Sequence, residues 1–288
     1  MNDFAPLASW NGIIQPLADL KIPATDRGFL FGDGVYEAIR LYQGRPFLLD
    51  DHLERLKYSL GQIQIEHSVN QVRQSLLALV AQFPKCDGLA YLQVTRGAAP
   101  LRNHLFPVGV PPNEMIYVTP LEDPLARYRS SGITTTLTAD NRWHRPDIKS
   151  LNLLPNVLMR QKAFEAGAQE AILERWDGRI TEATSSNVFV VKDGVVRTPL
   201  RNQWILGGVS RNLIAGLSQK AGIPFSEDEL TRASLWEANE IFLSSTTSEV
   251  IAVTKVEKKT ISGGRPGPIT ERIHELFKES IQFWLRGA

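Results

Sequence analysis

Two kinds of hydrophobic pattern run along this chain, and together they predict its strands and helices. Apolar residues that alternate with polar ones, or short apolar runs between turn residues, are typical of strands, whereas apolar residues at i, i+3, i+4 and i+7 are typical of helices. The first pattern predicts strands near residues 9–13, 35–42, 89–97, 115–120, 133–138, 171–174, 180–182, 188–191 and 241–243. The second predicts helices near residues 50–63, 69–80, 153–166, 205–222 and 268–286.

Individual residues mark where these elements turn, begin or end. Asn11-Gly12 is a strong hairpin signal inside the first predicted strand pair. Asp50 and Ser68 are the expected N-caps of the first two helices, because their side-chain oxygens can accept from the free N–H groups of a first turn. Gly167 is the expected end of the third helix.

The length of the chain, 288 residues, is enough for two domains. Residues 121–131 are polar and carry Pro124 and several charges, which is typical of an interdomain linker. We therefore expect a smaller N-terminal domain over residues 1–124 and a larger C-terminal domain over residues 125–288.

Composition and charge exclude several classes of protein. The chain is 43% apolar and 22% charged, as ordinary globular proteins are, and its net charge of +1 argues against a nucleic-acid or membrane-surface protein. A single cysteine excludes a disulfide framework and a cysteine-based zinc site within one chain, and five scattered histidines form no His-x-x-x-His pair. No metal is therefore predicted. Residues 1–4 carry no signal-peptide pattern and no apolar run approaches about 20 residues, so we expect a cytoplasmic protein.

Lys149 lies between a turn-rich segment and an apolar run that opens a helix. A buried lysine loses its proton more easily and becomes the nucleophilic amine that a Schiff base requires. The ordinary alternative is a lysine whose stem packs while its ammonium group reaches water. Taken alone, the segment favours the ordinary alternative.

Three further stretches are candidates for binding an anion or a cation. Glu182 precedes the fully apolar strand at 188–191, where a buried carboxylate would need a cationic partner. Residues 205–212 open a helix with two glycines and a serine, and the free N–H groups of such a start can bind phosphate. The five hydroxyl residues at 244–248 follow a strand and could form a second phosphate cradle.

The N-terminal half contributes polar side chains that could line a site. Tyr36 lies on a strand with polar groups on both faces, which is either half-exposed or lines a site, and it could equally be a core tyrosine. Arg55 lies beside the apolar stripe of its helix, where it is either solvated or reaches inward to an anion. Arg102 and His104 project the same way from an extended loop and could clamp a carboxylate, although a pair of surface residues is the commoner case.

An amine, an acid, two phosphate seats and a carboxylate clamp together match the needs of pyridoxal phosphate. Its aldehyde requires a lysine, its ring nitrogen an acid, and its phosphate a helix start with hydroxyl groups. The chain also resembles the fold-type IV pyridoxal-phosphate enzymes from residue 27 to residue 249. That family includes D-amino acid transaminases, branched-chain aminotransferases and aminodeoxychorismate lyases. The motifs that carry the resemblance are FGDGVYE at 31–37, DIKSLNLL at 147–154, TEATSSN at 181–187 and STTSE at 245–249.

The resemblance implies a fold, a cofactor and a role for each candidate residue. The fold would be α/β (α+β), with a small N-terminal α/β domain, a larger C-terminal pseudo-barrel domain and pyridoxal 5'-phosphate between them. Lys149 would form the Schiff base and move the substrate proton, Glu182 would pair with the pyridine nitrogen, and Ser185 would support the ring. The phosphate would be held by Arg55, Val209, Ser210 and Thr246. The substrate carboxylate would be bound by Tyr36, Arg102 and His104.

The clamp residues and the Tyr36 strand look most like the D-amino acid transaminase branch. We therefore expect transfer of the amino group of D-alanine or D-glutamate to a 2-oxo acid such as 2-oxoglutarate, in a homodimer whose clamp loop serves the neighbouring active site. The alternatives are a branched-chain L-amino acid aminotransferase, an aminodeoxychorismate lyase and a cofactor-binding protein without activity. One departure bears on the choice: Leu101 is inserted into the family's Pro-Arg-x-His clamp, which would change the substrate range.

Overall fold

The computed structural model describes residues 5–123 and 125–287. Residues 1–4, on which the prediction about a signal peptide rests, lie outside the described residues, as do Pro124 of the predicted linker and Ala288. The chain divides into two compact units. The first contains the described residues up to Glu122 together with Ile148–Asn152, and the second contains Asp123–Asp147 and the described residues from Leu153 onward.

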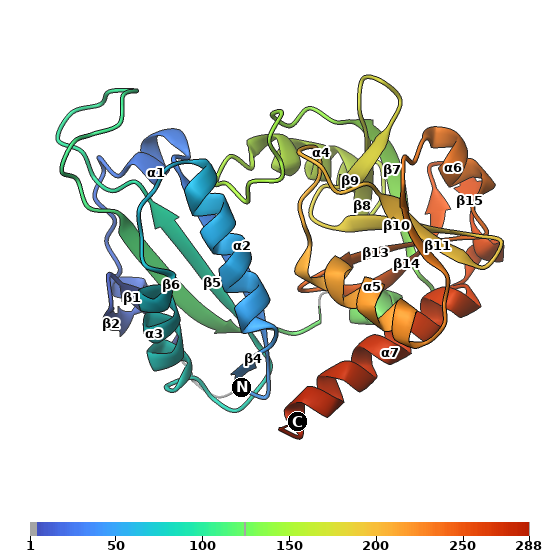
Figure 1. Cartoon of the computed structure of the whole chain (residues 1–288), viewed down its shortest axis with the longest axis horizontal. Coiled ribbons are helices and arrows are strands. Elements are labelled where there is room, and N and C mark those ends of the chain that lie inside the picture. The colour runs from blue at the N-terminus through green and yellow to red at the C-terminus, as the bar shows by residue number, and fades with distance from the viewer. Residues whose placement is uncertain (1–4, 124, 288) are drawn as a thin grey trace. The chain divides into compact units, whose positions relative to one another are not determined.

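The first unit is an antiparallel sheet of six strands in the order β2-β1-β6-β5-β3-β4, with α2 and α3 packed on one face (Figure 1). Its strands are β1 (Leu7–Trp10), β2 (Ile13–Pro16), β3 (Gly34–Tyr42), β4 (Arg45–Pro46), β5 (Gly88–Thr95) and β6 (Asn113–Pro120). Its helices are η1 (Leu17–Asp19), α1 (Arg27–Phe31), α2 (Leu49–Gln62) and α3 (Val69–Val80). The predicted hairpin is confirmed, because Asn11 and Gly12 both have positive φ between β1 and β2.

The core of the first unit lies between the sheet and its two helices. The apolar stripe predicted for α2 is buried at Leu53, Leu56 and Leu60, against residues of β3, β5 and β6. Ser68 caps α3 as predicted, because its hydroxyl accepts from the Gln71 N–H group. The cap predicted at Asp50 is wrong. The helix begins two residues earlier, at Leu49, after a left-handed Leu48 and without a side-chain cap, so Asp50 lies within the first turn.

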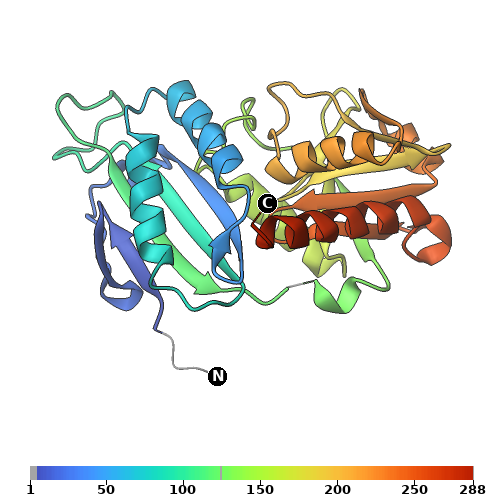
Figure 2. The same cartoon turned by 60° about the horizontal axis from the view of Figure 1, so that its bottom comes forward.

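The second unit is built on nine strands in the order β12-β11-β10-β13-β14-β7-β8-β9, with β15 paired to β14. The sheet curls, so that β9 lies beside β10 and β11, while α5 and α7 pack against β13 and against each other (Figures 1 and 2). Its strands are β7 (Ile133–Ala139), β8 (Glu170–Glu174), β9 (Ile180–Ala183), β10 (Asn187–Lys192), β11 (Val195–Pro199), β12 (Phe225–Asp228), β13 (Glu240–Ser245), β14 (Glu249–Val256) and β15 (Lys259–Thr260). Its helices are η2 (Ala126–Tyr128), α4 (Leu154–Glu165), α5 (Val209–Lys220), α6 (Arg232–Glu237), η3 (Ser262–Gly264) and α7 (Pro268–Leu285). The predicted mixed α/β class with a curled C-terminal sheet is confirmed.

The helix α4 follows the predicted lysine segment and has two apolar faces. Met159 and Ala163 are buried against β8, and Gly167 ends the helix with φ +79°, as predicted. On the opposite face a second apolar row is largely exposed, consisting of Leu154, Val157, Leu158 and Phe164. An exposed apolar patch of this kind commonly marks a protein–protein contact.

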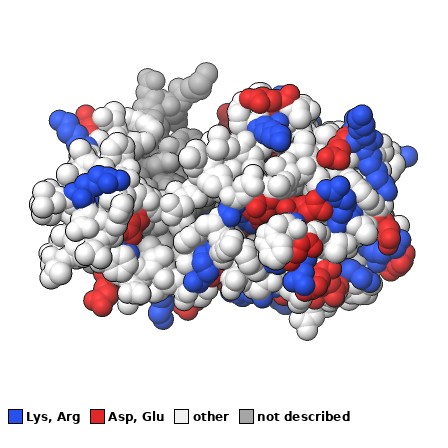
Figure 3. Space-filling model, turned by 90° about the horizontal axis from the view of Figure 1, so that it is seen from above, with Lys and Arg blue, Asp and Glu red and all other residues white. Residues whose placement is uncertain are grey.

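The face of the molecule drawn in Figure 3 carries mixed charge. In the view of Figure 3, basic and acidic side chains are interspersed over the described residues of this face rather than gathered into an extended surface of one sign. This distribution agrees with the net charge of +1. Among the described helices, none is both long and apolar enough to span a bilayer.

Candidate active site

Lys149 is held by the backbone of the first unit, although it comes between two segments of the second. Its carbonyl accepts from the Tyr36 N–H group at 2.9 Å, and its own N–H group donates to the Ser59 hydroxyl at 3.2 Å. Ser150 forms a bridge with Val35 on β3. Backbone pairing therefore fixes the lysine at the start of β3.

A glycine makes this close approach possible. The Leu151 N–H group donates to the Gly34 carbonyl at 3.0 Å. A Cβ atom on Gly34 would lie 2.9 Å from the Leu151 side chain and 2.7 Å from the Val94 carbonyl, both too close for any larger residue. The glycines of the FGDGVYE motif thus serve, in part, to let the lysine segment pack on β3.

Tyr36 and Lys149, two of the predicted site residues, lie together. The Lys149 Nζ is 4.1 Å from the centroid of the Tyr36 ring, within cation–π distance. The Tyr36 ring stacks on Tyr91 at 5.7 Å, and Tyr91 stacks on Tyr117 at 5.1 Å. Burial, with the neighbouring tyrosines, raises the pKa of Tyr91, so this phenol stays neutral. The half-buried amine therefore faces the first of a row of stacked aromatic rings.

Arg55 does reach inward, and the anion that it meets is Glu37. Its Nε and Nη2 each donate to a Glu37 oxygen at 2.7 Å, and His52 Nδ1 lies 2.8 Å from the same carboxylate. Glu37 is fully buried on the face of β3 opposite Tyr36. Burial raises the pKa of Glu37, but the charge and hydrogen bonds of Arg55, with those of His52, outweigh this effect and lower the pKa to about 2. The role of Arg55 in binding phosphate stays a prediction.

Arg102 and His104 lie on an exposed loop and share one aromatic partner. The Arg102 guanidinium carbon is 4.9 Å from the centroid of the Phe31 ring, and the His104 ring is 5.4 Å from the same centroid. The two side chains therefore project the same way, as their spacing predicted. The inserted Leu101 is 79% exposed and leaves the pair together.

Glu182, on β9, is buried at the centre of a polar cluster in the second unit. Arg142 Nη1 donates to its Oε1. Its Oε2 accepts from Asn187 Nδ2 at 3.1 Å and from the Leu206 N–H group at 3.2 Å. The predicted need for a cationic partner is thus met by Arg142. Because a carboxylate accepts about four hydrogen bonds, these three described donors leave room for one more.

A second carboxylate shares the same arginine. Asp140 accepts from Arg142 Nε at 2.9 Å, from Arg142 Nη2 at 2.7 Å and from the Thr181 hydroxyl at 2.8 Å. Asp140, Arg142 and Glu182 are each about 6% exposed at the side chain, so two buried carboxylates face one guanidinium. Burial raises the pKa of Glu182 despite the opposing charge of Arg142. With both carboxylates ionised, the cluster carries one negative charge in excess. A cation hydrogen-bonded to Glu182 would balance that charge and oppose the effect of burial.

The predicted phosphate residues of the second unit gather at one end of the β10–β13 pair. Asn187, which donates to Glu182, lies opposite Ser244 in the register of these strands. Gly208, the N-cap of α5, packs so closely on Asn187 that a Cβ atom would lie 1.9 Å from its Oδ1. The start of α5 is thereby placed beside the end of β13.

That edge presents backbone N–H groups and hydroxyl groups. Val209 and Ser210 form the first turn of α5, which no side chain caps within the described part of the chain. Thr246 lies in the tight turn between β13 and β14, where the Ser245 and Ser248 hydroxyls are 2.6 Å apart. Uncapped N–H groups beside hydroxyls make a chemically suitable phosphate seat.

Ser185 follows β9, and its hydroxyl donates to Glu170 Oε2 at 3.0 Å. Glu170 is buried and is also bonded to Thr184 and Arg160. Ser185 is therefore fixed by the scaffold beside Glu182.

Several important residues were missed by the sequence-based prediction. Arg142 and Asp140 come between the predicted strand at 133–138 and Lys149, in a stretch without periodicity. Only the expected cation for Glu182 pointed to Arg142, and any of the other 31 arginine and lysine residues could have met that need. The pairing of strands β7, β8 and β9 selects Arg142.

Comparison with known proteins agrees with this geometry. The chain matches the family model for amino-transferase class IV over residues 34–256. It is 42% identical to the D-alanine aminotransferase of Bacillus licheniformis over 274 residues, which cover 94% of this chain and 96% of that protein. Its fold resembles that of the branched-chain amino acid aminotransferase of Escherichia coli, with a TM-score of 0.89, 26% identity, and 96% and 94% of the two chains covered. The 4-amino-4-deoxychorismate lyase of Pseudomonas aeruginosa is similar, with a TM-score of 0.83, 26% identity, and 95% and 98% covered.

Proposed function

This chain belongs to the amino-transferase class IV family, whose members use pyridoxal 5'-phosphate, and from that premise we propose that it is a D-amino acid transaminase. It would transfer the amino group of D-alanine, or of a similar D-amino acid, to a 2-oxo acid such as 2-oxoglutarate. The observation that carries the proposal is the 42% identity to a D-alanine aminotransferase over 94% of the chain. Identity to the branched-chain enzyme and to the lyase is 26% in each case.

Lys149 is the proposed catalytic residue. Its amine would hold the cofactor by condensing with the aldehyde, with loss of water, and would move the proton at the substrate Cα. Bound pyridoxal phosphate would supply an electron sink for the pair left by that proton. The support is the position of the amine, which backbone pairing with β3 holds 4.1 Å from the centroid of the Tyr36 ring.

Glu182 is the proposed partner of the pyridine nitrogen. Its carboxylate would accept the N–H bond of the protonated ring and keep that proton in place. Two features of the cluster fit a pyridinium cation: one acceptor position remains beside the three described donors, and the group carries one excess negative charge.

The phosphate would be bound by the first turn of α5, by the Thr246 hydroxyl and by Arg55. The two N–H groups of Val209 and Ser210 and the positive end of the helix favour a dianion at that point. Ser185, fixed by Glu170, would support the ring.

Arg102 and His104, with Tyr36, would bind the substrate carboxylate. The guanidinium can donate two parallel hydrogen bonds to a carboxylate, and the imidazole can add a third. The anchor of the carboxylate decides which face of Cα meets the lysine, and hence which enantiomer reacts. The shared contact with Phe31 keeps the two donors together and supports this role.

We further propose that the protein is a homodimer, in which the loop that carries Arg102 and His104 serves the neighbouring subunit's site. We also propose that it is located in the cytoplasm. The exposed apolar row on α4 supports self-association, since Phe164 alone is 71% exposed.

Enantiomerically pure D- and L-alanine, each with 2-oxoglutarate, test the substrate assignment. We expect turnover of D-alanine that falls at least about tenfold in Arg102→Ala. Turnover of L-alanine or L-leucine alone would assign a branched-chain-type enzyme instead. Release of pyruvate from aminodeoxychorismate without any 2-oxo acid acceptor would assign a lyase.

A further inference from the structure

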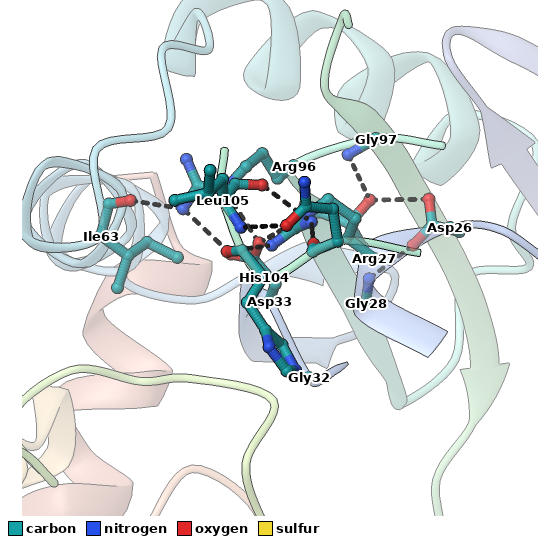
Figure 4. Close-up of polar contacts among 12 residues, drawn as sticks. Asp26, Arg27, Gly28, Gly32, Asp33, Ile63, Arg96, Gly97, His104 and Leu105 are labelled. Atoms are coloured by element: carbon teal, nitrogen blue, oxygen red, sulfur yellow. Dashed lines mark hydrogen bonds and ion pairs between the residues drawn. The ribbon is translucent and has the colours of Figure 1, made fainter. Parts of the chain in front are cut away.

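The side chain of Arg27 ties the short helix α1 to the loop that carries Arg102 and His104 (Figure 4). Its guanidinium is buried. Nη1 donates to the Asn103 carbonyl and, at 3.3 Å, to the Leu105 carbonyl, while Nη2 donates to the His104 carbonyl at 3.4 Å. Three consecutive peptide groups of an exposed loop are therefore bound to one side chain.

Arg27 requires these carbonyls as hydrogen-bond acceptors, because it shares Asp33, its only described carboxylate partner, with Arg96. Its Nε donates to Asp33 Oδ2 at 2.7 Å, and Arg96 donates to both oxygens of Asp33, at 2.8 and 2.9 Å. Two buried guanidinium groups against one carboxylate leave a positive charge in excess, so their remaining N–H groups require neutral acceptors. Arg96 finds these in the carbonyls of Ile63 and Gln64, whereas Arg27 finds them in the loop.

The Asp33 carboxyl group, which pairs with both arginines, is ionised throughout the neutral range. Burial raises the pKa of Asp33, but hydrogen bonds from Arg96 and Arg27 outweigh this effect and lower the pKa below its usual value. The short helix is itself fixed, because Asp26 caps it by accepting from the Gly28 N–H group at 2.8 Å and also accepts from Thr95.

The same helix also supplies the surface on which the clamp side chains rest. The Phe31 ring contacts the guanidinium of Arg27 at 4.8 Å, that of Arg102 at 4.9 Å and the imidazole of His104 at 5.4 Å. One five-residue helix thus fixes both the backbone of the loop and the orientation of its two donors.

We propose that Arg27 is a positioning residue for substrate binding: it holds the loop so that Arg102 and His104 present their donors together. The proposal rests on the proposed role of that pair in binding the substrate carboxylate.

Trypsin cleavage after Arg102 tests whether Arg27 holds the loop, independently of any activity. The variant is Arg27→Lys, which keeps the charge but cannot span three carbonyls and a carboxylate. The matched control is Arg40→Lys, which removes another buried guanidinium of the first unit, paired to Asp87 and remote from the loop. We expect cleavage at least about fivefold faster in Arg27→Lys than in wild type, and wild-type rates in the control. Equal rates in all three proteins would overturn the proposal.

Steady-state kinetics of the holoenzyme test whether the loop position matters for substrate. We expect Arg27→Lys to raise KM for D-alanine and for 2-oxoglutarate about tenfold, with a smaller change in kcat. In an Arg102→Ala background the same substitution should change KM less than about twofold, because the donor that it positions is already gone. A full tenfold effect in that background would overturn the proposal, since Arg27 would then act by another route.

The two proposals fail in different ways. An unchanged KM in Arg102→Ala would overturn the clamp and the kinetic role of Arg27 with it, while the trypsin rates still decide whether Arg27 holds the loop. If Arg27→Lys does not accumulate as folded protein, Arg27→Gln, which is neutral and keeps an amide donor, replaces it with the same expected order of cleavage rates and KM values.

Discussion

The side-chain nitrogen of Lys149 lies 4.1 Å from the centroid of the Tyr36 ring, and the Tyr36 N–H group donates to the Lys149 carbonyl at 2.9 Å. The two residues therefore contact each other through both their backbones and their side chains. A lysine on a loop would ordinarily move with the loop, whereas Lys149 is held by β3, the strand that begins within the FGDGVYE motif. The position of the amine is therefore a property of the sheet.

Lys149→Ala should abolish transamination, because no other described side chain replaces an amine held over that ring. We expect kcat to fall by about a thousandfold or more, the range in which positioned proton transfer contributes. The half-reaction with D-alanine, followed by the absorbance of the cofactor, is the measurement. Lys57→Ala, at an exposed position of α2, is the control and should retain wild-type turnover. Comparable activity in Lys149→Ala would remove the lysine from the mechanism.

Arg142→Gln should weaken the proposed partner of the pyridine nitrogen. Burial already raises the pKa of Glu182, and Arg142 is the charge that opposes this effect. Without it the carboxyl group is protonated at higher pH, so the acid limb of the kcat profile should move to higher pH, and kcat at pH 7 should fall about ten- to a hundredfold. Glu182→Gln keeps the size of the side chain but removes its charge. This variant should lose as much activity as Arg142→Gln, and its kcat profile should lack the acid limb that titration of Glu182 causes. An acid limb at the wild-type pH in Arg142→Gln would contradict the assignment.

Much of the fold followed from periodicity alone. The stripe of Leu53, Leu56 and Leu60 on α2, the Ser68 cap and the turn at Asn11 were predictable because each depends on neighbours within one or two turns of chain. The cap at Asp50 was predicted wrongly because the left-handed Leu48, a conformation that apolar residues rarely adopt, begins the helix earlier.

The environment of the site residues was harder to predict than the residues themselves. Motifs pointed to Lys149 and Glu182, but their partners depend on pairings far apart in sequence. Arg142 lies 40 residues before Glu182, and Arg27 lies 76 residues before Asn103. Nothing local in the sequence marks either arginine, because its acceptors are selected only when the sheets form.

Glu37→Gln should remove a pH-dependent part of the stability. The pKa of Glu37 is lowered to about 2 in the folded chain, against 4.5 for an ordinary glutamate. A carboxyl group whose pKa is lowered on folding stabilises the protein fully above pH 4.5, and that stabilisation is lost as pH falls from about 4.5 to about 2. The shift corresponds to about 3 kcal/mol, of which more than half is lost by pH 3.

Urea unfolding followed by circular dichroism, at pH 6.5 and at pH 3, measures this contribution. We expect the difference in stability between wild type and Glu37→Gln to be largest at pH 6.5, where the Glu37 carboxylate is ionised and paired with Arg55. The difference should shrink by about 2 kcal/mol at pH 3. Glu54→Gln, at an exposed position of α2, is the control and should follow wild type at both pH values. An undiminished difference at pH 3 would show that Glu37 does not titrate as argued.

Phe164→Asp should break the proposed homodimer. Phe164 extends the exposed apolar row of α4, opposite the buried Met159 and Ala163, and a carboxylate there would have to be desolvated on association. We expect the wild type to have the mass of two 32.2 kDa chains by light scattering, and Phe164→Asp that of one, with lower transaminase activity because the clamp loop then lacks its neighbouring site. Trp176→Asp is the matched control, since Trp176 is an 80% exposed aromatic residue in the turn between β8 and β9, outside α4, and it should remain dimeric. A dimer that survives Phe164→Asp unchanged would place the subunit contact on another face.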